Sequence, residues 1–173
     1  MSLTPSSMLP LNTPAPAFTL TDTLTQTSIS PQSYAINQPM VIIFMCNHCP
    51  YVIHLLDSLI SVARRYQERG IAFISISSND ITTHPQDAPE HMAQLAKEMN
   101  FPFPYCYDET QDVARAYHAT CTPDFFLFNA EHRLVYRGQF DASRPGNRIP
   151  ANGDQLTAAL DHVITGTPLA EQQ

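Results

Sequence analysis

A continuous apolar run, MVIIFMC (40–46), passes directly into a helical pattern, and this order constrains the fold more than any other feature. A short apolar stretch with β-branched residues is typical of a central strand that is buried on both faces. Apolar residues then recur at helical spacing over 52–66, with Pro50 near the start and Gly70 after the end. A second buried run, IAFISIS (71–77), completes a strand–helix–strand unit.

Helical and strand patterns continue to alternate along the rest of the chain. Asp87 followed by Glu90 resembles a capping box and predicts a helix whose apolar face carries Met92 and Met99. Further expected elements are a short strand at 103–107, a short helix after Asp108, two antiparallel strands within 124–140 and a final helix at 156–164. This order predicts a mixed sheet covered on both faces, which is a three-layer α/β architecture.

The length of 173 residues and the hydrophobic share of 43% indicate one ordinary globular domain. We expect residues 1–14, rich in Ser, Thr and Pro, to form a flexible arm and residues 15–173 to form the domain. No stretch reaches the roughly 18–20 apolar residues of a membrane span, and the first residues lack the basic start of a signal peptide. We therefore expect a cytoplasmic protein.

The net charge of −7, with Lys97 as the single lysine, argues against nucleic acid or an anionic membrane as the main partner. In a reducing cytosol, a close pair of cysteines is more often catalytic or metal-binding than a structural disulfide. The chain has such a pair in CNHCP, where Asn47 and His48 separate Cys46 from Cys49.

Several types of site contain such a pair. Haem attachment requires a histidine directly after the second cysteine, and Pro50 stands there instead. A structural zinc site usually takes two close pairs, whereas Cys106 and Cys121 are far apart in the sequence. Two cysteines buried as small apolar residues are the plainest alternative. A redox couple remains the most specific interpretation.

The redox interpretation has a physical basis. We expect the strand to pass into the helix at Cys46, which would place an exposed sulfur beside free N–H groups at the positive end of the helix dipole. Cys49, about one turn later, would attack a mixed disulfide formed at Cys46. His48 would either donate to the Cys46 thiolate, favouring the reduced form, or be a solvated surface residue. We expect the other histidines to be surface residues.

A second motif, CTPDFF (121–126), opens the later pair of strands. CNHCP after the first core strand together with this motif resembles the thioredoxin-like superfamily, in its redoxin branch of the AhpC/TSA (peroxiredoxin-like) type, over residues 14–166. The resemblance implies a thioredoxin-like α/β/α sandwich in which a cis-proline at Pro123 faces Cys46. It also implies that the Thr122 backbone pairs with a substrate strand. Cys121 would then either border the substrate groove or be an ordinary core or surface cysteine.

The sequence departs from the family pattern at several positions. Peroxiredoxins carry Thr or Ser three residues before the peroxidatic cysteine, and Ile43 stands at that offset from Cys46. Typical thioredoxins have an aspartate six residues before the first cysteine, where this chain has Met40. They also have Gly-Pro between the cysteines, in place of Asn47 and His48. These departures weaken the expectation of peroxidase activity.

We therefore predict a thiol–disulfide oxidoreductase with Cys46, Cys49 and His48 as catalytic residues and Asn47, Cys121, Thr122 and Pro123 at the substrate site. The expected substrates are protein or small-molecule disulfides and thiols, with a thioredoxin- or glutathione-type electron donor. No cofactor or metal is expected. The alternatives are a thiol peroxidase, a thiolate metal-binding module suited to Cu(I), and a non-catalytic scaffold.

Overall fold

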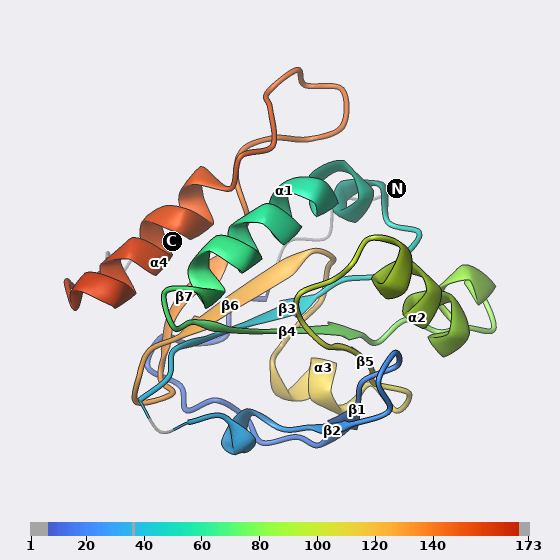
Figure 1. Ribbon diagram of the computed structural model, residues 1–173, viewed down its shortest axis with the longest axis horizontal. Coiled ribbons are helices and arrows are strands. Elements are labelled where there is room, and N and C mark those ends of the chain that lie inside the picture. Colours follow the sequence, from blue (N-terminus) through green and yellow to red (C-terminus); the bar gives the residue numbers. More distant parts are fainter. Residues whose placement is uncertain (1–6, 36, 170–173) are drawn as a thin grey trace.

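The computed structural model describes residues 7–35 and 37–169, and its centre is a five-stranded mixed sheet (Figure 1). The strand order is β5-β4-β3-β6-β7. β3, β4 and β5 run parallel, while β6 is antiparallel to β3 and β7 is antiparallel to β6. The strands span Met40–Phe44 (β3), Ala72–Ser77 (β4), Tyr105–Tyr107 (β5), Asp124–Phe128 (β6) and Leu134–Gly138 (β7).

Helices cover both faces of this sheet, as the sequence predicts (Figure 1). α1 and α4 lie together on one face, α2 lies near β5, and α3 lies on the opposite face with the small antiparallel pair β1 and β2. The helices span Pro50–Gln67 (α1), Pro89–Glu98 (α2), Asp112–Ala116 (α3) and Asp154–Thr165 (α4), and the short strands are Leu20–Thr21 (β1) and Ser28–Ile29 (β2). The 3₁₀ turns are Pro31–Ser33 (η1) and Pro85–Asp87 (η2).

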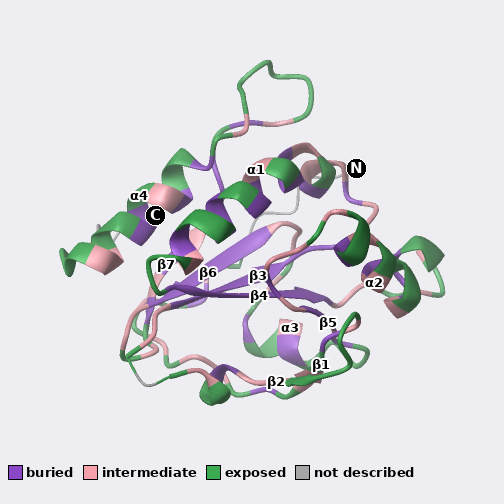
Figure 2. Ribbon diagram, viewed as in Figure 1, coloured by how far each residue is buried: buried purple, intermediate pink, exposed green. Residues whose placement is uncertain are grey.

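The central strands are buried along their whole length (Figure 2). Because successive side chains point to opposite faces of a strand, β3 contributes to two separate cores. Val41 and Ile43 pack with α1 and α4, whereas Ile42 and Phe44 pack with Tyr117 just after α3. An apolar residue is therefore required at every position of β3, which accounts for the unbroken run in the sequence.

Residues 9–15, near the start of the described chain, pack against the five-stranded sheet. Leu9 is buried, Asn12 N–H donates to the carbonyl of Leu134, and Ala15 N–H donates to that of His132. The flexible arm expected over residues 1–14 therefore does not extend over this described part, and residues 1–6 lie outside the described residues. None of the described helices is both long enough and apolar enough to cross a membrane.

Pairing between β3 and β6 determines what meets at one end of the sheet. Phe44 is the partner of Asp124 at the end of that ladder. Cys46 lies two residues beyond Phe44, and Thr122 lies two residues before Asp124. The same antiparallel register, continued past the strands, brings Cys46 opposite Thr122. Two motifs that are far apart in the chain therefore meet beyond the carboxyl end of β3.

The entry to α4 gives a test of this packing. Gly153 has φ +69°, and a Cβ there would lie 2.5 Å from Cζ of Phe140. We expect Gly153→Ala to lower the free energy of unfolding by about 2–4 kcal/mol, from left-handed backbone strain and overpacking. Gly166→Ala is the matched control, because φ there is +73° and no atom lies within 4 Å. It should cost only about 1 kcal/mol. Equal losses for both variants in urea unfolding would contradict this account.

Candidate active site

The segment that joins β3 to α1 carries both cysteines of the close pair. α1 begins at Pro50, and its N-cap is Cys49. The expectation that the helix begins at Cys46 is therefore wrong, because residues 45–49 form a loop before the helix. The sulfur beside the first free N–H groups of the helix is consequently that of Cys49.

Both cysteines of the pair are buried. Cys46 is 1% exposed and Cys49 is 7% exposed, so the expectation of an exposed sulfur at Cys46 is also wrong. The reason is that Met45 N–H donates to the carbonyl of Ile76 at 2.9 Å, which continues the sheet ladder past β3 and keeps Cys46 inside. None of the four cysteines, all of which lie in the described residues, forms a disulfide.

The loop before β6 faces this pair, as the resemblance implies. The peptide bond between Thr122 and Pro123 is cis. The Thr122 hydroxyl lies 3.8 Å from the Cys46 sulfur, and the Cys49 thiol donates to the Thr122 carbonyl at 3.4 Å. In the dithiol form this carbonyl thus contacts the couple directly.

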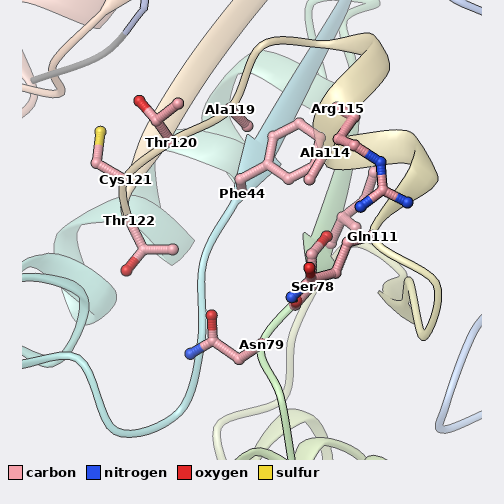
Figure 3. A pocket seen from close by; sticks show the side chains of 11 residues that line it. Phe44, Ser78, Asn79, Gln111, Ala114, Arg115, Ala119, Thr120, Cys121 and Thr122 are labelled. Carbon is pink, nitrogen blue, oxygen red and sulfur yellow. The ribbon is translucent and has the colours of Figure 1, made fainter. Parts of the chain in front are cut away.

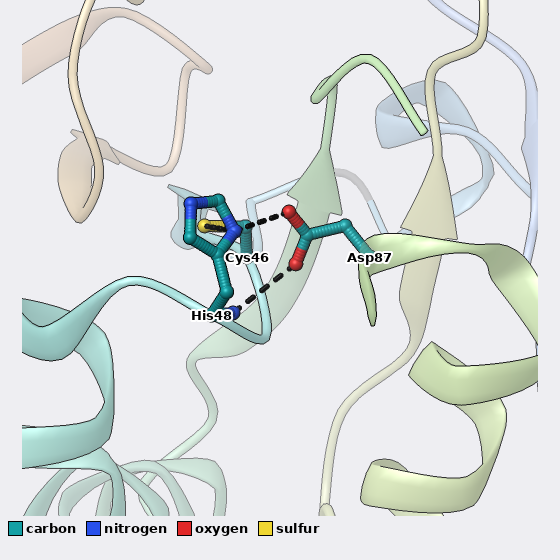
Figure 4. Close-up of side chains that lie close together, drawn as sticks. All are labelled: Cys46, His48 and Asp87. Atoms are coloured by element: carbon teal, nitrogen blue, oxygen red, sulfur yellow. Dashed lines mark hydrogen bonds and ion pairs between the residues drawn. The ribbon is translucent and has the colours of Figure 1, made fainter. Parts of the chain in front are cut away.

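The carboxylate of Asp87 reaches into the cysteine loop (Figure 4). Asp87 is fully buried, and it accepts hydrogen bonds from the backbone N–H groups of Asn47 and His48 at 2.8 and 3.1 Å. The ring of His48 also contacts it through Nδ1, and Asn79 donates to it at 2.9 Å. The expected capping box is therefore wrong, because α2 has Ala88 as N-cap and no side-chain cap.

The two polar residues between the cysteines are fixed by neighbouring elements. The Asn47 amide accepts from the Tyr105 hydroxyl at 3.0 Å and donates to the Gln86 carbonyl at 3.1 Å. The His48 ring stacks on His84 with centroids 4.2 Å apart, and its Nδ1 lies 3.7 Å from the Cys46 sulfur. The side chain of Asn47 thus connects the cysteine loop to Tyr105 and to the backbone of Gln86.

Four residues at this site were not singled out as functional in the sequence, namely Asn79, His84, Asp87 and Tyr105. They approach the cysteine loop from β5 and from the segment between β4 and α2. The carboxyl ends of the parallel strands β3 and β4 lie at the same edge of the sheet. The sequence could therefore have predicted that the segment after β4, which carries Asn79, His84 and Asp87, lies near the cysteine loop after β3. Nothing in the local pattern of those residues distinguishes them.

Each of the two thiols affects the ionisation of the other, and their surroundings differ. The pKa of the Cys49 thiol is lowered, first because Cys46 donates its S–H to the Cys49 thiolate. The Thr122 hydroxyl and the backbone N–H groups of Val52 and Tyr51 also stabilise that thiolate. Cys49 therefore lies at the end of α1 where the helix favours an anion.

Cys46 has the opposite tendency. Its pKa is raised, first because its S–H is held by Cys49, then by burial and by the negative charge of Asp87. The attacking role that the sequence predicts for Cys46 stays a prediction.

The other two cysteines are poorer nucleophiles. Cys106 is fully buried in β5, and burial first raises its pKa to about 12. Cys121 is partly buried, and burial together with Asp124 raises its pKa to about 12. Neither environment favours a thiolate at neutral pH.

A cavity of about 330 Å³ lies between the loop before β6 and α3 (Figure 3). Cys121 and Thr122 line it on one side, Gln111 and Arg115 line it on the other, and Phe44 also borders it. Thr122 therefore borders both the cavity and the cysteine couple. Binding of a substrate at Cys121 and Thr122 stays a prediction.

Cys46, His48 and Asp87 present ligand atoms that all lie within 4.8 Å of one another. A metal ion there would compete with four hydrogen bonds to Asp87, including two from backbone N–H groups that cannot turn away. The contacts are thus those of a hydrogen-bond network, and they do not favour a metal ion held by Cys46, His48 and Asp87.

The family model described as AhpC/TSA matches residues 11–137. An uncharacterized conserved protein from Geobacillus kaustophilus is 44% identical, with a TM-score of 0.96 over 100% of this chain and 92% of that one. A hypothetical protein from Sinorhizobium meliloti is 37% identical, with a TM-score of 0.95 over 99% and 93%. A thioredoxin-family thiol:disulfide interchange protein from Chlorobium tepidum has a TM-score of 0.68 at 15% identity, covering 95% and 99%. No curated protein matches.

The thiolate assignment can be tested by titrating the reduced protein at 240 nm. We expect one thiol of the couple to ionise below the ordinary value of about 8.5, because Cys49 is stabilised as described. Cys46→Ser should keep a lowered pKa, since a serine hydroxyl still donates to Cys49. Cys49→Ser should leave only a thiol with a raised pKa. The reverse pattern would assign the thiolate to Cys46.

Proposed function

Because this chain belongs to the AhpC/TSA family, we propose that it is a thiol–disulfide oxidoreductase with Cys46 and Cys49 as its redox couple. The family match and the thioredoxin-like fold support a redox function in general. The single observation that carries the finer proposal is that Cys46 and Cys49, on the loop that leads into α1, both contact Thr122 beside the cis-proline.

In the proposed reaction, the Cys49 thiolate attacks one sulfur of a substrate disulfide. The substrate S–S bond breaks, and the leaving thiolate takes up a proton. Cys46 then loses its proton and attacks the Cys49 sulfur, which releases the second substrate thiol. Two electrons and the Cys46 proton pass from the couple to the substrate, the second proton comes from the solvent that took it when the Cys49 thiolate formed, and a Cys46–Cys49 disulfide remains. The reverse sequence oxidises a dithiol.

Substrate access requires a change at the buried couple. A substrate strand that pairs with the backbone of Thr122 would take the carbonyl that now accepts from Cys49. The His48 ring is 26% exposed in its side chain and lies 3.7 Å from the Cys46 sulfur, so we expect it to shift when a second sulfur reaches the pair. We propose protein or small-molecule disulfides as substrates and a thioredoxin- or glutathione-type donor for reduction of the couple.

Serine variants of the couple test the function and the order of attack. We expect Cys46→Ser and Cys49→Ser each to reduce insulin turnover at least a hundredfold, because the cycle uses both sulfurs. If Cys49 attacks first, Cys46→Ser accumulates a mixed disulfide with a peptide disulfide substrate, whereas Cys49→Ser does not. Mass spectrometry of the trapped species measures this.

Cys106→Ala is the control for removal of a buried thiol outside the couple, and we expect it to retain turnover. Unchanged insulin reduction by Cys46→Ser would remove the proposed function. Trapping only by Cys49→Ser would keep the function but return the attacking role to Cys46, as the sequence predicted.

One observation favours a second candidate, a thiol peroxidase. The Thr122 hydroxyl contacts both sulfurs and lies where it can polarise a peroxide, although the usual family threonine is absent. The Cys49 thiolate would attack the O–O bond and give a sulfenic acid and water or an alcohol. Cys46 would then displace the hydroxyl group as water and form the disulfide.

Stopped-flow oxidation by hydrogen peroxide tests this candidate. It predicts a rate constant for Cys49 well above that of free cysteine, and about a tenfold loss in Thr122→Val, which removes one hydrogen bond to a charged group. Thr120→Val is the matched control, because Thr120 lines the cavity but is not among the groups that act on the sulfurs. A rate equal to that of free cysteine would eliminate the peroxidase.

A further inference from the structure

The cavity between the loop before β6 and α3 lies beside the redox couple, and the proposed reaction does not use it (Figure 3). Cys46 and Cys49 do not line this cavity. Thr122 lines it and also contacts both sulfurs, because its hydroxyl lies 3.8 Å from that of Cys46 and its carbonyl lies 3.4 Å from that of Cys49. A molecule held in the cavity is therefore separated from the couple by one residue.

The size of the cavity limits what it can hold. Its volume of about 330 Å³ is at the lower end of the range of about 300–1,000 Å³ that is usual for small-molecule sites. A molecule of the size of a dipeptide or tripeptide suits such a space. A protein substrate that pairs with the Thr122 backbone is recognised as a strand, through main-chain hydrogen bonds, and does not require the cavity. The cavity therefore indicates a small substrate.

The lining of the cavity favours an anion that also accepts hydrogen bonds. None of the described lining residues is acidic, although the chain has 16 acidic residues. Arg115 is the one cationic residue among them, and Asn79 and Gln111 contribute amide groups. Phe44 and Ala119 provide apolar contact. A peptide-like molecule with a carboxylate matches this combination of groups.

Arg115 has a partner that a ligand can replace. Its Nη2 donates to the Thr110 carbonyl at 2.7 Å and to Asp112 at 2.5 Å. Both side chains of this ion pair are largely exposed, so the pair contributes little to stability. The buried carboxylate of Asp108 already accepts from the Ser78 hydroxyl and from N–H groups of α3. A ligand carboxylate therefore competes mainly with Asp112 for the guanidinium, whose planar fork can bind a carboxylate through two hydrogen bonds.

We propose that the cavity binds a small disulfide that carries a carboxylate, and that Arg115 determines the preference for this substrate class. Arg115 holds the carboxylate of one half of the substrate, Gln111 bonds its amide groups, and the disulfide passes Thr122 to reach the couple. The substrate S–S bond then breaks, two electrons from the couple and protons from the couple and the solvent convert its sulfurs to two thiols, and the couple becomes a disulfide. This inference rests on the proposed function, for which it names the substrate class.

Two substrates with the same skeleton test the preference. The reduced full-length protein is mixed with oxidised glutathione, whose glycine carboxylates are free, or with its diester, in which ethyl groups block them. Acid quenching and mass spectrometry then measure the rate constant for formation of the disulfide of the couple. We expect the free acid to react about tenfold faster than the diester, because it alone offers Arg115 a charged acceptor.

Variants of the ion pair should change the ratio of these two rate constants in opposite directions. Arg115→Gln removes the cation, so the ratio should fall about tenfold, to near one. Asp112→Asn removes the competing carboxylate, so the ratio should rise about threefold. Arg64→Gln is the matched control, because Arg64 is an exposed arginine of α1 that does not line the cavity. Its ratio should equal that of the wild type.

Binding is measured separately with a probe that cannot react. S-methylglutathione has neither a thiol nor a disulfide, and it is titrated by calorimetry into the double variant Cys46→Ser/Cys49→Ser. We expect saturable binding, which Arg115→Gln should weaken about tenfold and Asp112→Asn should strengthen.

The outcomes separate the inference from the proposed function. A ratio near one in a wild-type protein that reduces insulin would overturn the inference and leave the function in place. So would a change in Arg115→Gln no larger than that in Arg64→Gln. A protein that binds the probe through Arg115 but reduces neither insulin nor oxidised glutathione would reject the proposed function, while the cavity would remain a site for a carboxylate-bearing ligand.

Discussion

The hydrogen bonds between the Asp87 carboxylate and the cysteine loop are the constraint on which the rest of the site depends. The loop N–H groups of Asn47 and His48 have no partner in the sheet or in α1, and Asp87 supplies one. A buried carboxylate without such donors would be strongly unfavourable, and so would buried donors without an acceptor. The carboxylate and the two N–H groups each offset the free-energy cost of burying the other, and their hydrogen bonds define the path of the chain from β3 to α1.

That path gives the two cysteines unequal environments. Cys49 occupies the N-cap of α1, where the amides of the first turn are available to an anion. Cys46 remains an extension of β3, enclosed by Thr122 and by the imidazole of His48. Two thiols separated by two residues thus come to differ in acidity through the position at which the helix begins.

Much of the fold follows from local pattern in the sequence. The unbroken apolar residues of β3 and the helical spacing in α1 reflect burial that each element requires by itself, so both were predicted close to their observed bounds. The motif at Thr122 and Pro123 was placed correctly beside the couple only through a family resemblance, because no local signal gives the register of β6 on β3.

Features that depend on distant partners were missed. Asp87 has the local context of a helix cap, and only the approach of the loop after β4 to the loop after β3 shows where its carboxylate points. The burial of Cys46 likewise depends on a ladder bond to Ile76 and on a contact with Thr122. The helix starts at Pro50, four residues after the start expected at Cys46, and this offset places Cys49 instead of Cys46 at the N-cap of α1.

The register between β3 and β6 also limits how such a protein can diverge. A slip of two residues moves a strand by about 7 Å along its neighbour, which would separate Thr122 from both sulfurs while keeping every apolar side chain on its proper face. The apolar residues of the core therefore do not by themselves fix the register between β3 and β6. Lengthening the hairpin around Asn129, at the far end of β6, leaves the alignment intact, whereas inserting a single residue between Thr122 and Asp124 would uncouple the substrate loop from the thiols. We therefore expect related proteins to vary in length at the hairpin around Asn129 and to keep a constant length between Thr122 and Asp124.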